Sequence, residues 1–132
     1  MNITERRTRE RQMNRTIKPR DLRSMLESRQ DVTILDVRRK TDYDADHGVI
    51  PDAEWRDPER VEVWSMDLPK NREIVIYCAR GGSVSKMVLD RLLDKGIQAR
   101  YIEGGIAEWK AAGGEIIEKT SREIIGDHEQ QG

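Results

Sequence analysis

The sequence has 132 residues and contains no phenylalanine, a single cysteine and only two histidines. One cysteine cannot form an internal disulfide, which is typical of a reducing compartment, so the thiol of Cys78 is either inert or reactive. Two histidines beside one cysteine, without close spacing, do not form a metal-site pattern, and we expect no metal. No apolar run approaches membrane-spanning length and the first residues lack the apolar stretch of a signal peptide, so we expect a cytoplasmic protein without membrane contact.

Hydrophobic residues make up 36% of the chain and charged residues 37%, with a formal net charge of −1. This composition predicts a single domain with a small hydrophobic core and a highly charged surface. The charge is uneven, because residues 1–20 carry seven Lys and Arg against two Glu. We therefore predict a basic N-terminal arm at residues 1–16, a folded domain at 17–114, and an acidic C-terminal tail or extra helix at 115–132. Nucleic-acid contact by the arm is a minor alternative, since such charge runs are usually solvated.

Short β-branched apolar segments alternate with segments of helical periodicity. The expected strands are residues 32–37, 73–77 and 100–102, with a brief strand within 48–53 that Pro51 cuts short. The expected helices are 19–26, 58–68, 83–95 and 105–109. Apolar strands alternating with helices predict an α/β fold whose central, mostly parallel sheet has helices on both faces.

Cys78 directly follows the most apolar predicted strand, and a helix is predicted to begin at Ser83. In open parallel sheets, ligands bind beyond the carboxyl ends of the strands, and a helix N-terminus there attracts anions. The Gly81-Gly82 pair allows the loop to curl so that several amides converge, and Arg80 adds a positive charge. Such surroundings favour the thiolate of Cys78 over the thiol. From these residues alone, an inert buried cysteine before a plain glycine turn remains the alternative.

Three separate motifs resemble the rhodanese superfamily over roughly residues 17–114. Asp-Val-Arg at 36–38, followed by Tyr43 and His-Gly-Val-Ile-Pro-Asp-Ala at 47–53, is similar to the upstream signature, with the His and Gly exchanged. Residues 77–83, Tyr-Cys-Ala-Arg-Gly-Gly-Ser, resemble the active-site loop. Residues 103–114, with two Gly-Gly pairs around a Trp, resemble the closing signature. Together, in this order, the motifs indicate a member of this superfamily.

The resemblance implies a single rhodanese-like α/β domain and sulfur transfer without a metal or organic cofactor. Cys78 would be the nucleophile that carries sulfane sulfur as a persulfide. The partners would be a small anionic donor such as thiosulfate and a thiol, cyanide or protein acceptor. The residues expected to bind the anion and the persulfide are Ala79, Arg80, Gly81, Gly82, Ser83 and Val84. Arg80 matches a position that is often basic in thiosulfate-using members.

The active-site loop looks one residue longer than in the usual single-domain members. Longer loops in the superfamily belong to phosphatases and arsenate reductases, which place an arginine at the loop end, where this chain has Val84. That oxyanion chemistry is one alternative function, and a non-catalytic binding or redox-sensing module is another. A fainter likeness to the rhodanese domains of chromate-resistance proteins says little about the substrate.

Asp36 and Arg38 end a predicted strand, and the resemblance implies that they form a structural pair that supports the loops. His47 is expected to be a hydrogen-bonded structural residue, and His128 falls in the predicted tail. Tyr77 alternates with Cys78 along the strand and is expected to face the opposite side, in the core.

Overall fold

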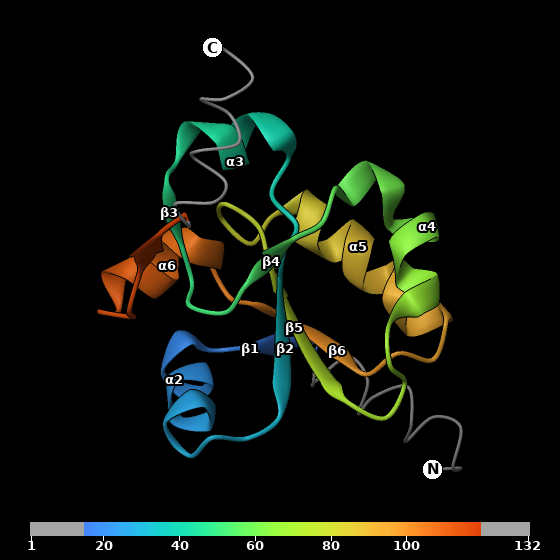
Figure 1. Ribbon diagram of the computed structural model, residues 1–132, viewed down its shortest axis with the longest axis horizontal. Helices are drawn as coiled ribbons and strands as arrows, with labels where there is room; N and C mark the ends of the chain where they lie inside the picture. Colours follow the sequence, from blue (N-terminus) through green and yellow to red (C-terminus); the bar gives the residue numbers. More distant parts are fainter. Residues whose placement is uncertain (1–14, 120–132) are drawn as a thin grey trace, which may run out of the picture.

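The computed structural model describes residues 15–119, and in these residues five parallel strands form one sheet in the order β1-β6-β5-β2-β4 (Figure 1). The strands are β1 (Thr16–Ile17), β2 (Val32–Asp36), β4 (Glu54–Trp55), β5 (Glu73–Tyr77) and β6 (Ala99–Ile102). β5 lies at the centre, where it pairs with β2 on one side and with β6 on the other. The predicted parallel sheet is confirmed.

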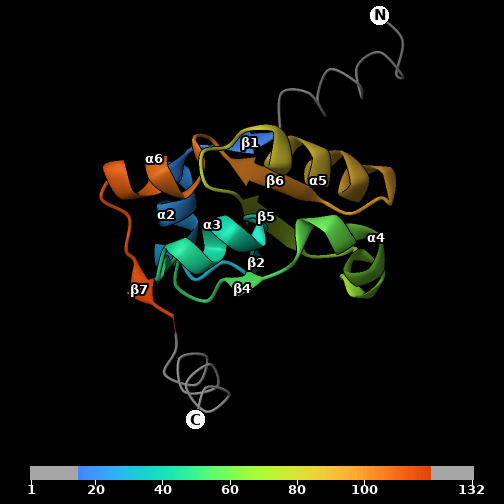
Figure 2. The same cartoon turned by 90° about the horizontal axis from the view of Figure 1, so that it is seen from above.

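Helices cover both faces of this sheet, as predicted (Figure 2). α2 (Pro19–Glu27) and α6 (Gly105–Ala111) pack on one face. α4 (Val61–Trp64) and α5 (Ser83–Asp94) pack on the other. The short 3-10 helices η1 (Pro58–Arg60) and η2 (Ser65–Asp67) flank α4, so the helix predicted over 58–68 is present as three shorter pieces.

The central strand explains why its sequence is continuously apolar. Ile74 and Ile76 belong to the core beneath α4 and α5, and Val75 and Tyr77 belong to the core beneath α2 and α6. All four side chains have 0% exposure, because a strand with helices on both faces has no solvent side. Tyr77 therefore lies on the opposite face from Cys78, as the alternation predicts.

The brief strand predicted within residues 48–53 is confirmed, although it does not join the central sheet. β3 (Gly48–Val49) pairs antiparallel with β7 (Ile117–Glu118), outside the central sheet. A turn follows, in which the N–H of Ala53 donates to the carbonyl of Ile50 and Asp52 has a φ of +67°. The edge strand β4 and the helix α3 (Lys40–Ala45) were not predicted, since a two-residue strand has no readable alternation and α3 buries no residue.

Most of the two predicted terminal segments lies outside the described residues. Within them, Thr16 belongs to β1, Arg15 forms an ion pair with Asp90 at 2.8 Å, and the indole N–H of Trp109 donates to the carbonyl of Glu115. The folded structure thus includes Arg15 at one end and β7 at the other. No helix among residues 15–119 is long and apolar enough to cross a bilayer.

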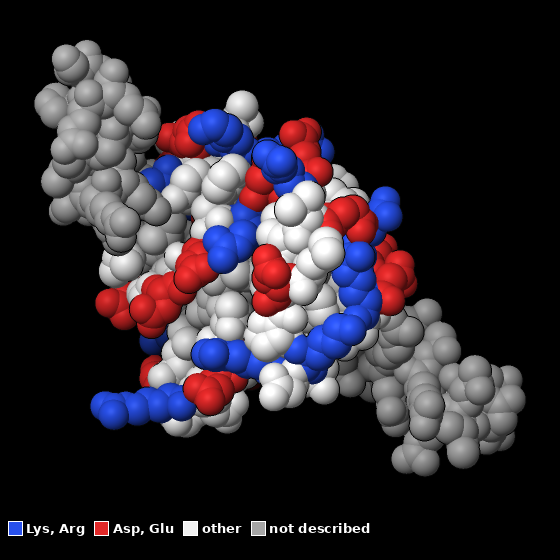
Figure 3. Space-filling model, turned by 45° about the vertical axis from the view of Figure 1, so that its right-hand side comes forward, with Lys and Arg blue, Asp and Glu red and all other residues white. Residues whose placement is uncertain are grey.

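The high charge content appears on the surface as a mixture of both signs. Figure 3 shows Lys and Arg side by side with Asp and Glu over the visible face. Glu62, for example, is within 3.3 Å of Arg91 and 3.0 Å of Lys95. Exposed pairs of this kind contribute little to stability, because water and salt screen both charges.

Candidate active site

Cys78 is the first residue after β5, at the carboxyl edge of the sheet. Its thiol is free and its side chain is 5% exposed. It belongs to the core cluster beneath α4 and α5, together with Val37, Val61 and Val88. The cysteine is therefore fixed at the boundary between a packed core and the loop that follows it.

The loop after Cys78 leaves a run of backbone amides without partners. Within residues 15–119, the N–H groups of residues 79–85 donate no hydrogen bond, and the first amide of α5 that does so is that of Lys86, to the carbonyl of Gly82. The carbonyls of Cys78 and Ala79 accept hydrogen bonds from Ile106 and Ala107 in the first turn of α6. Because the C=O and N–H of a trans peptide unit point in opposite directions, the N–H groups of Ala79 and Arg80 are directed away from α6. These two amides thus lie on the side of the loop that faces away from α6, where they can bind an anion.

Close backbone contact with the Gly104-Gly105 pair fixes this loop. A Cβ on Gly105 would lie 2.4 Å from the carbonyl oxygen of Cys78 and 2.7 Å from the nitrogen of Arg80. A Cβ on Gly81, whose φ is +68°, would lie 2.7 Å from the nitrogen of Gly104. The backbones approach too closely for a side chain at either position, which explains the glycines at 81 and 105.

This contact predicts different outcomes for the two adjacent loop glycines. We expect Gly81→Ala to lower the free energy of unfolding by at least about 1–2 kcal/mol, the cost of the left-handed conformation alone, and to shift the loop. Gly82→Ala is the matched control, because its φ is −93° and a Cβ there meets nothing within 4 Å. Urea unfolding of the two variants checks this. Equal stability losses would show that the glycine contact does not hold the loop.

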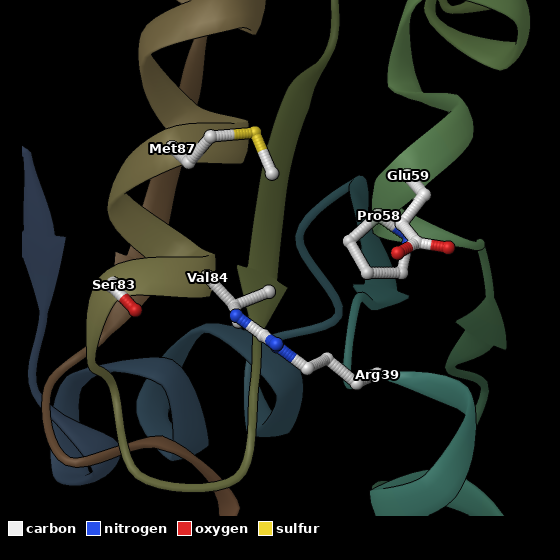
Figure 4. A pocket seen from close by; sticks show the side chains of 6 residues that line it. All are labelled: Arg39, Pro58, Glu59, Ser83, Val84 and Met87. Atoms are coloured by element: carbon white, nitrogen blue, oxygen red, sulfur yellow. The ribbon is translucent and has the colours of Figure 1, made fainter.

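The predicted anion-binding residues spread over the rim of the loop. Arg80, Gly82 and Ser83 are exposed, whereas Ala79, Gly81 and Val84 are partly buried. The guanidinium of Arg80 makes no ion pair with any described residue. Ser83 and Val84 begin α5 and line a cavity of about 320 Å³ beside the loop (Figure 4).

Four other residues line this cavity, and none of them was predicted as a site residue. They are Arg39, Pro58, Glu59 and Met87. Arg39 comes from the connection between β2 and α3 and points toward Val84, while Pro58 and Glu59 come from η1 across the cavity (Figure 4). Only the tertiary fold brings these segments together, so no local pattern marks them.

Asp36 and Arg38 form a buried ion pair on the α2 and α6 side of the carboxyl edge. Each is 1% exposed, and the Nη2 of Arg38 donates to Oδ2 of Asp36 at 2.7 Å. Arg38 also donates to the carbonyl of Gly48 and to Asp46, and its own carbonyl accepts from the indole of Trp55. Burial alone would lower the pKa of Arg38, but the hydrogen bonds and charge of Asp36 outweigh it, so this pKa is raised. The pair connects β2 to the ends of α3, β3 and β4.

Tyr77 and Asp46 complete this buried network. Burial, together with the charge of Asp36, raises the pKa of Tyr77 far above its usual value, so the hydroxyl stays protonated and donates to Asp36 at 3.1 Å. Burial alone would raise the pKa of Asp46, but hydrogen bonds from Lys110 and from the N–H of Gly48 lower it overall. His47 is exposed, and within residues 15–119 its only hydrogen bond is the one that its carbonyl accepts from the N–H of Lys119. Among these residues, the hydrogen bond expected of His47 is therefore made by its backbone and not by its ring.

Comparison with known proteins identifies the family to which this fold belongs. The family model of the rhodanese-like domain matches residues 18–112, so the chain belongs to the rhodanese-like family. It is 31% identical over 97 residues to a sulfurtransferase of Allochromatium vinosum, covering 73% of this chain and 88% of that protein. It is 30% identical over 92 residues to the thiosulfate sulfurtransferase GlpE of Pseudoalteromonas translucida, covering 69% and 85%. A rhodanese-like domain protein from Staphylococcus aureus has a similar structure, with a TM-score of 0.68 and 29% identity over 80% of this chain and 99% of its own.

Proposed function

We propose that this protein is a sulfurtransferase in which Cys78 carries sulfane sulfur as a persulfide between a donor such as thiosulfate and a thiophilic acceptor. The observation that carries the proposal is the position of the free thiol of Cys78 at the start of a loop whose amides have no partner among the described residues. The similarity to proteins named sulfurtransferases supports the same chemistry.

The reaction has two balanced half-reactions. The thiolate of Cys78 attacks the outer sulfur of thiosulfate, a new S–S bond forms, and the bond to the sulfonate sulfur breaks, so that sulfite leaves with the electron pair. An acceptor thiolate or cyanide then attacks the outer sulfur of the persulfide. The bond to Sγ of Cys78 breaks and returns its electron pair to the cysteine. The unpaired amides stabilise the anionic persulfide between the two steps.

Intact-mass spectrometry of the protein after incubation with thiosulfate tests this proposal. We expect the mass to increase by one sulfur atom at Cys78 and to return to its original value after cyanide is added. A protein that takes up no sulfur from thiosulfate or from polysulfide, and reacts only with oxidants such as peroxide, would instead be a redox-sensing module.

Arg80 is expected to favour an anionic donor. Thiosulfate is a dianion whose sulfonate must lie near the loop, and the exposed guanidinium of Arg80 has no partner among residues 15–119. Because charge-assisted hydrogen bonds are strong, Arg80→Ala should lower kcat/KM for thiosulfate by roughly 10- to 150-fold. Transfer from a neutral polysulfide donor should fall much less. Equal losses with both donors would show that Arg80 acts on the cysteine alone.

An oxyanion-ester hydrolase is the second candidate, and one observation favours it. Phosphoryl recognition uses a guanidinium at the end of the loop, where this chain has Val84, and Arg39 points toward Val84 from another element (Figure 4). Hydrolysis of p-nitrophenyl phosphate that depends on both Cys78 and Arg39 would support this function. Sulfur uptake without such hydrolysis would support the sulfurtransferase.

A further inference from the structure

The cavity beside the active-site loop combines two unpaired charges of opposite sign with an apolar floor. Arg39 and Glu59 are both exposed side chains that line it. No ion pair joins them, and neither side chain is paired with any other described residue. Pro58, Val84 and Met87 supply apolar surface between them.

The cavity opens on the same side of the sheet as Cys78. Val84 packs against the core cluster that contains Cys78 and Val88. Ser83 and Val84 belong both to the cavity wall and to the run of unpaired amides that follows the cysteine. A molecule bound in the cavity is therefore next to the loop that would hold the persulfide.

We propose that this cavity binds the sulfur acceptor, and that the acceptor is a small zwitterionic thiol carrying both a carboxylate and an ammonium group, such as a free amino-acid thiol. This inference rests on the proposed sulfurtransferase function. The carboxylate pairs with the guanidinium of Arg39, which can bind both oxygens at once. The ammonium group pairs with Glu59, and the intervening carbon atoms contact Pro58, Val84 and Met87.

The two charges explain why a zwitterion fits better than a simple anion or cation. Arg39 and Glu59 belong to separate elements that border the same cavity (Figure 4). A thiol with only a carboxylate satisfies Arg39 but also meets the like charge of Glu59, and one with only an ammonium group has the reverse problem. The volume of about 320 Å³ is at the lower end of small-molecule sites, which suits a compound of amino-acid size.

Binding is tested first without any sulfur chemistry. S-Methylcysteine has both charges but no thiol, so we expect it to shift the amide NMR signals of Ser83, Val84 and Met87 in the resting protein. Arg39→Gln and Glu59→Gln should each weaken this binding roughly five- to tenfold. The matched controls Arg60→Gln and Asp67→Asn remove exposed charges from η1 and η2 that do not line the cavity, and they should leave binding unchanged. Absence of binding to the wild-type protein would overturn the inference, whether or not the protein transfers sulfur.

Transfer to four thiols then tests the charge assignments. Persulfidated protein is mixed with cysteine, 3-mercaptopropionate, cysteamine or 2-mercaptoethanol, and the transfer rate is measured. For each thiol the rate of the variant is divided by that of the wild type, so that the intrinsic reactivity of the thiol cancels. Arg39→Gln should slow transfer to the two carboxylate thiols and leave the other two within about twofold. Glu59→Gln should slow transfer to cysteine and cysteamine only. Equal losses for all four thiols would contradict acceptor binding by these two residues. A wild-type protein that binds S-methylcysteine but takes up no sulfur would contradict the proposed function alone.

Discussion

Cys78→Ser is expected to abolish sulfur uptake from thiosulfate and turnover to cyanide. The serine hydroxyl is not ionised near neutral pH and cannot form a persulfide, so both half-reactions stop. We expect the free energy of unfolding to change by less than about 1 kcal/mol, because the substitution is close to isosteric and the unpaired amides that follow residue 78 can bond the new hydroxyl. Thiocyanate production and urea unfolding measure the two effects.

Cys78→Ala is the matched control, since it removes the sulfur without adding a hydroxyl. It should be equally inactive. Comparing its free energy of unfolding with that of Cys78→Ser separates the effect of lost packing from the effect of burying a hydroxyl. Residual sulfur transfer in either variant would contradict the assignment of Cys78, because the sequence contains no second cysteine. If neither Cys78→Ser nor Cys78→Ala folds, Cys78 is a core packing residue, and the loss of activity no longer supports a reactive thiol.

The local architecture of the site was readable from the sequence because each part has its own periodic or conformational signal. The apolar run before Cys78 predicts a strand buried on both faces, and the spacing of Val84, Val88 and Leu92 predicts the helix that follows. The two glycine pairs predict tight turns, although only the structure shows that Gly81 packs against Gly104 and Gly105. These signals depend on neighbouring residues, so a single sequence contains them.

The cavity and the buried ion pair were harder to predict, for different reasons. Arg39 and Glu59 come from separate segments that line the same cavity. Nothing in the sequence around either residue distinguishes it from other surface charges. α3 and β4 were missed because polar or two-residue elements have no readable hydrophobic pattern. The pairing of Asp36 with Arg38 was suggested only by family resemblance, and the extent of the network that includes Asp46 and Gly48 required the tertiary structure.

Arg38→Met is expected to lower the free energy of unfolding by about 3–5 kcal/mol. It leaves the carboxylate of Asp36, which is 1% exposed, without its cation, and it leaves the carbonyl of Gly48 without this donor. The matched control is Arg56→Met, which breaks an ion pair between exposed side chains, since Arg56 is 38% and Glu54 is 64% exposed. We expect this control to lower the free energy of unfolding by about 1 kcal/mol or less. Both are measured by urea unfolding.

A double substitution separates the lost charge from the lost packing. In Asp36→Asn with Arg38→Met the buried charge is gone, while the amide that replaces the carboxylate keeps an oxygen that can accept from the hydroxyl of Tyr77, whose distance to Asp36 is 3.1 Å. We therefore expect the double variant to regain part of the stability that Arg38→Met loses, with an interaction energy of about 0.5–3 kcal/mol in the cycle. Additive losses would contradict a direct charge pairing. A Cys78 that still takes up sulfur in the double variant would show that the pair supports the loops without taking part in the chemistry, as its position on the opposite face of the sheet from Cys78 leads us to expect.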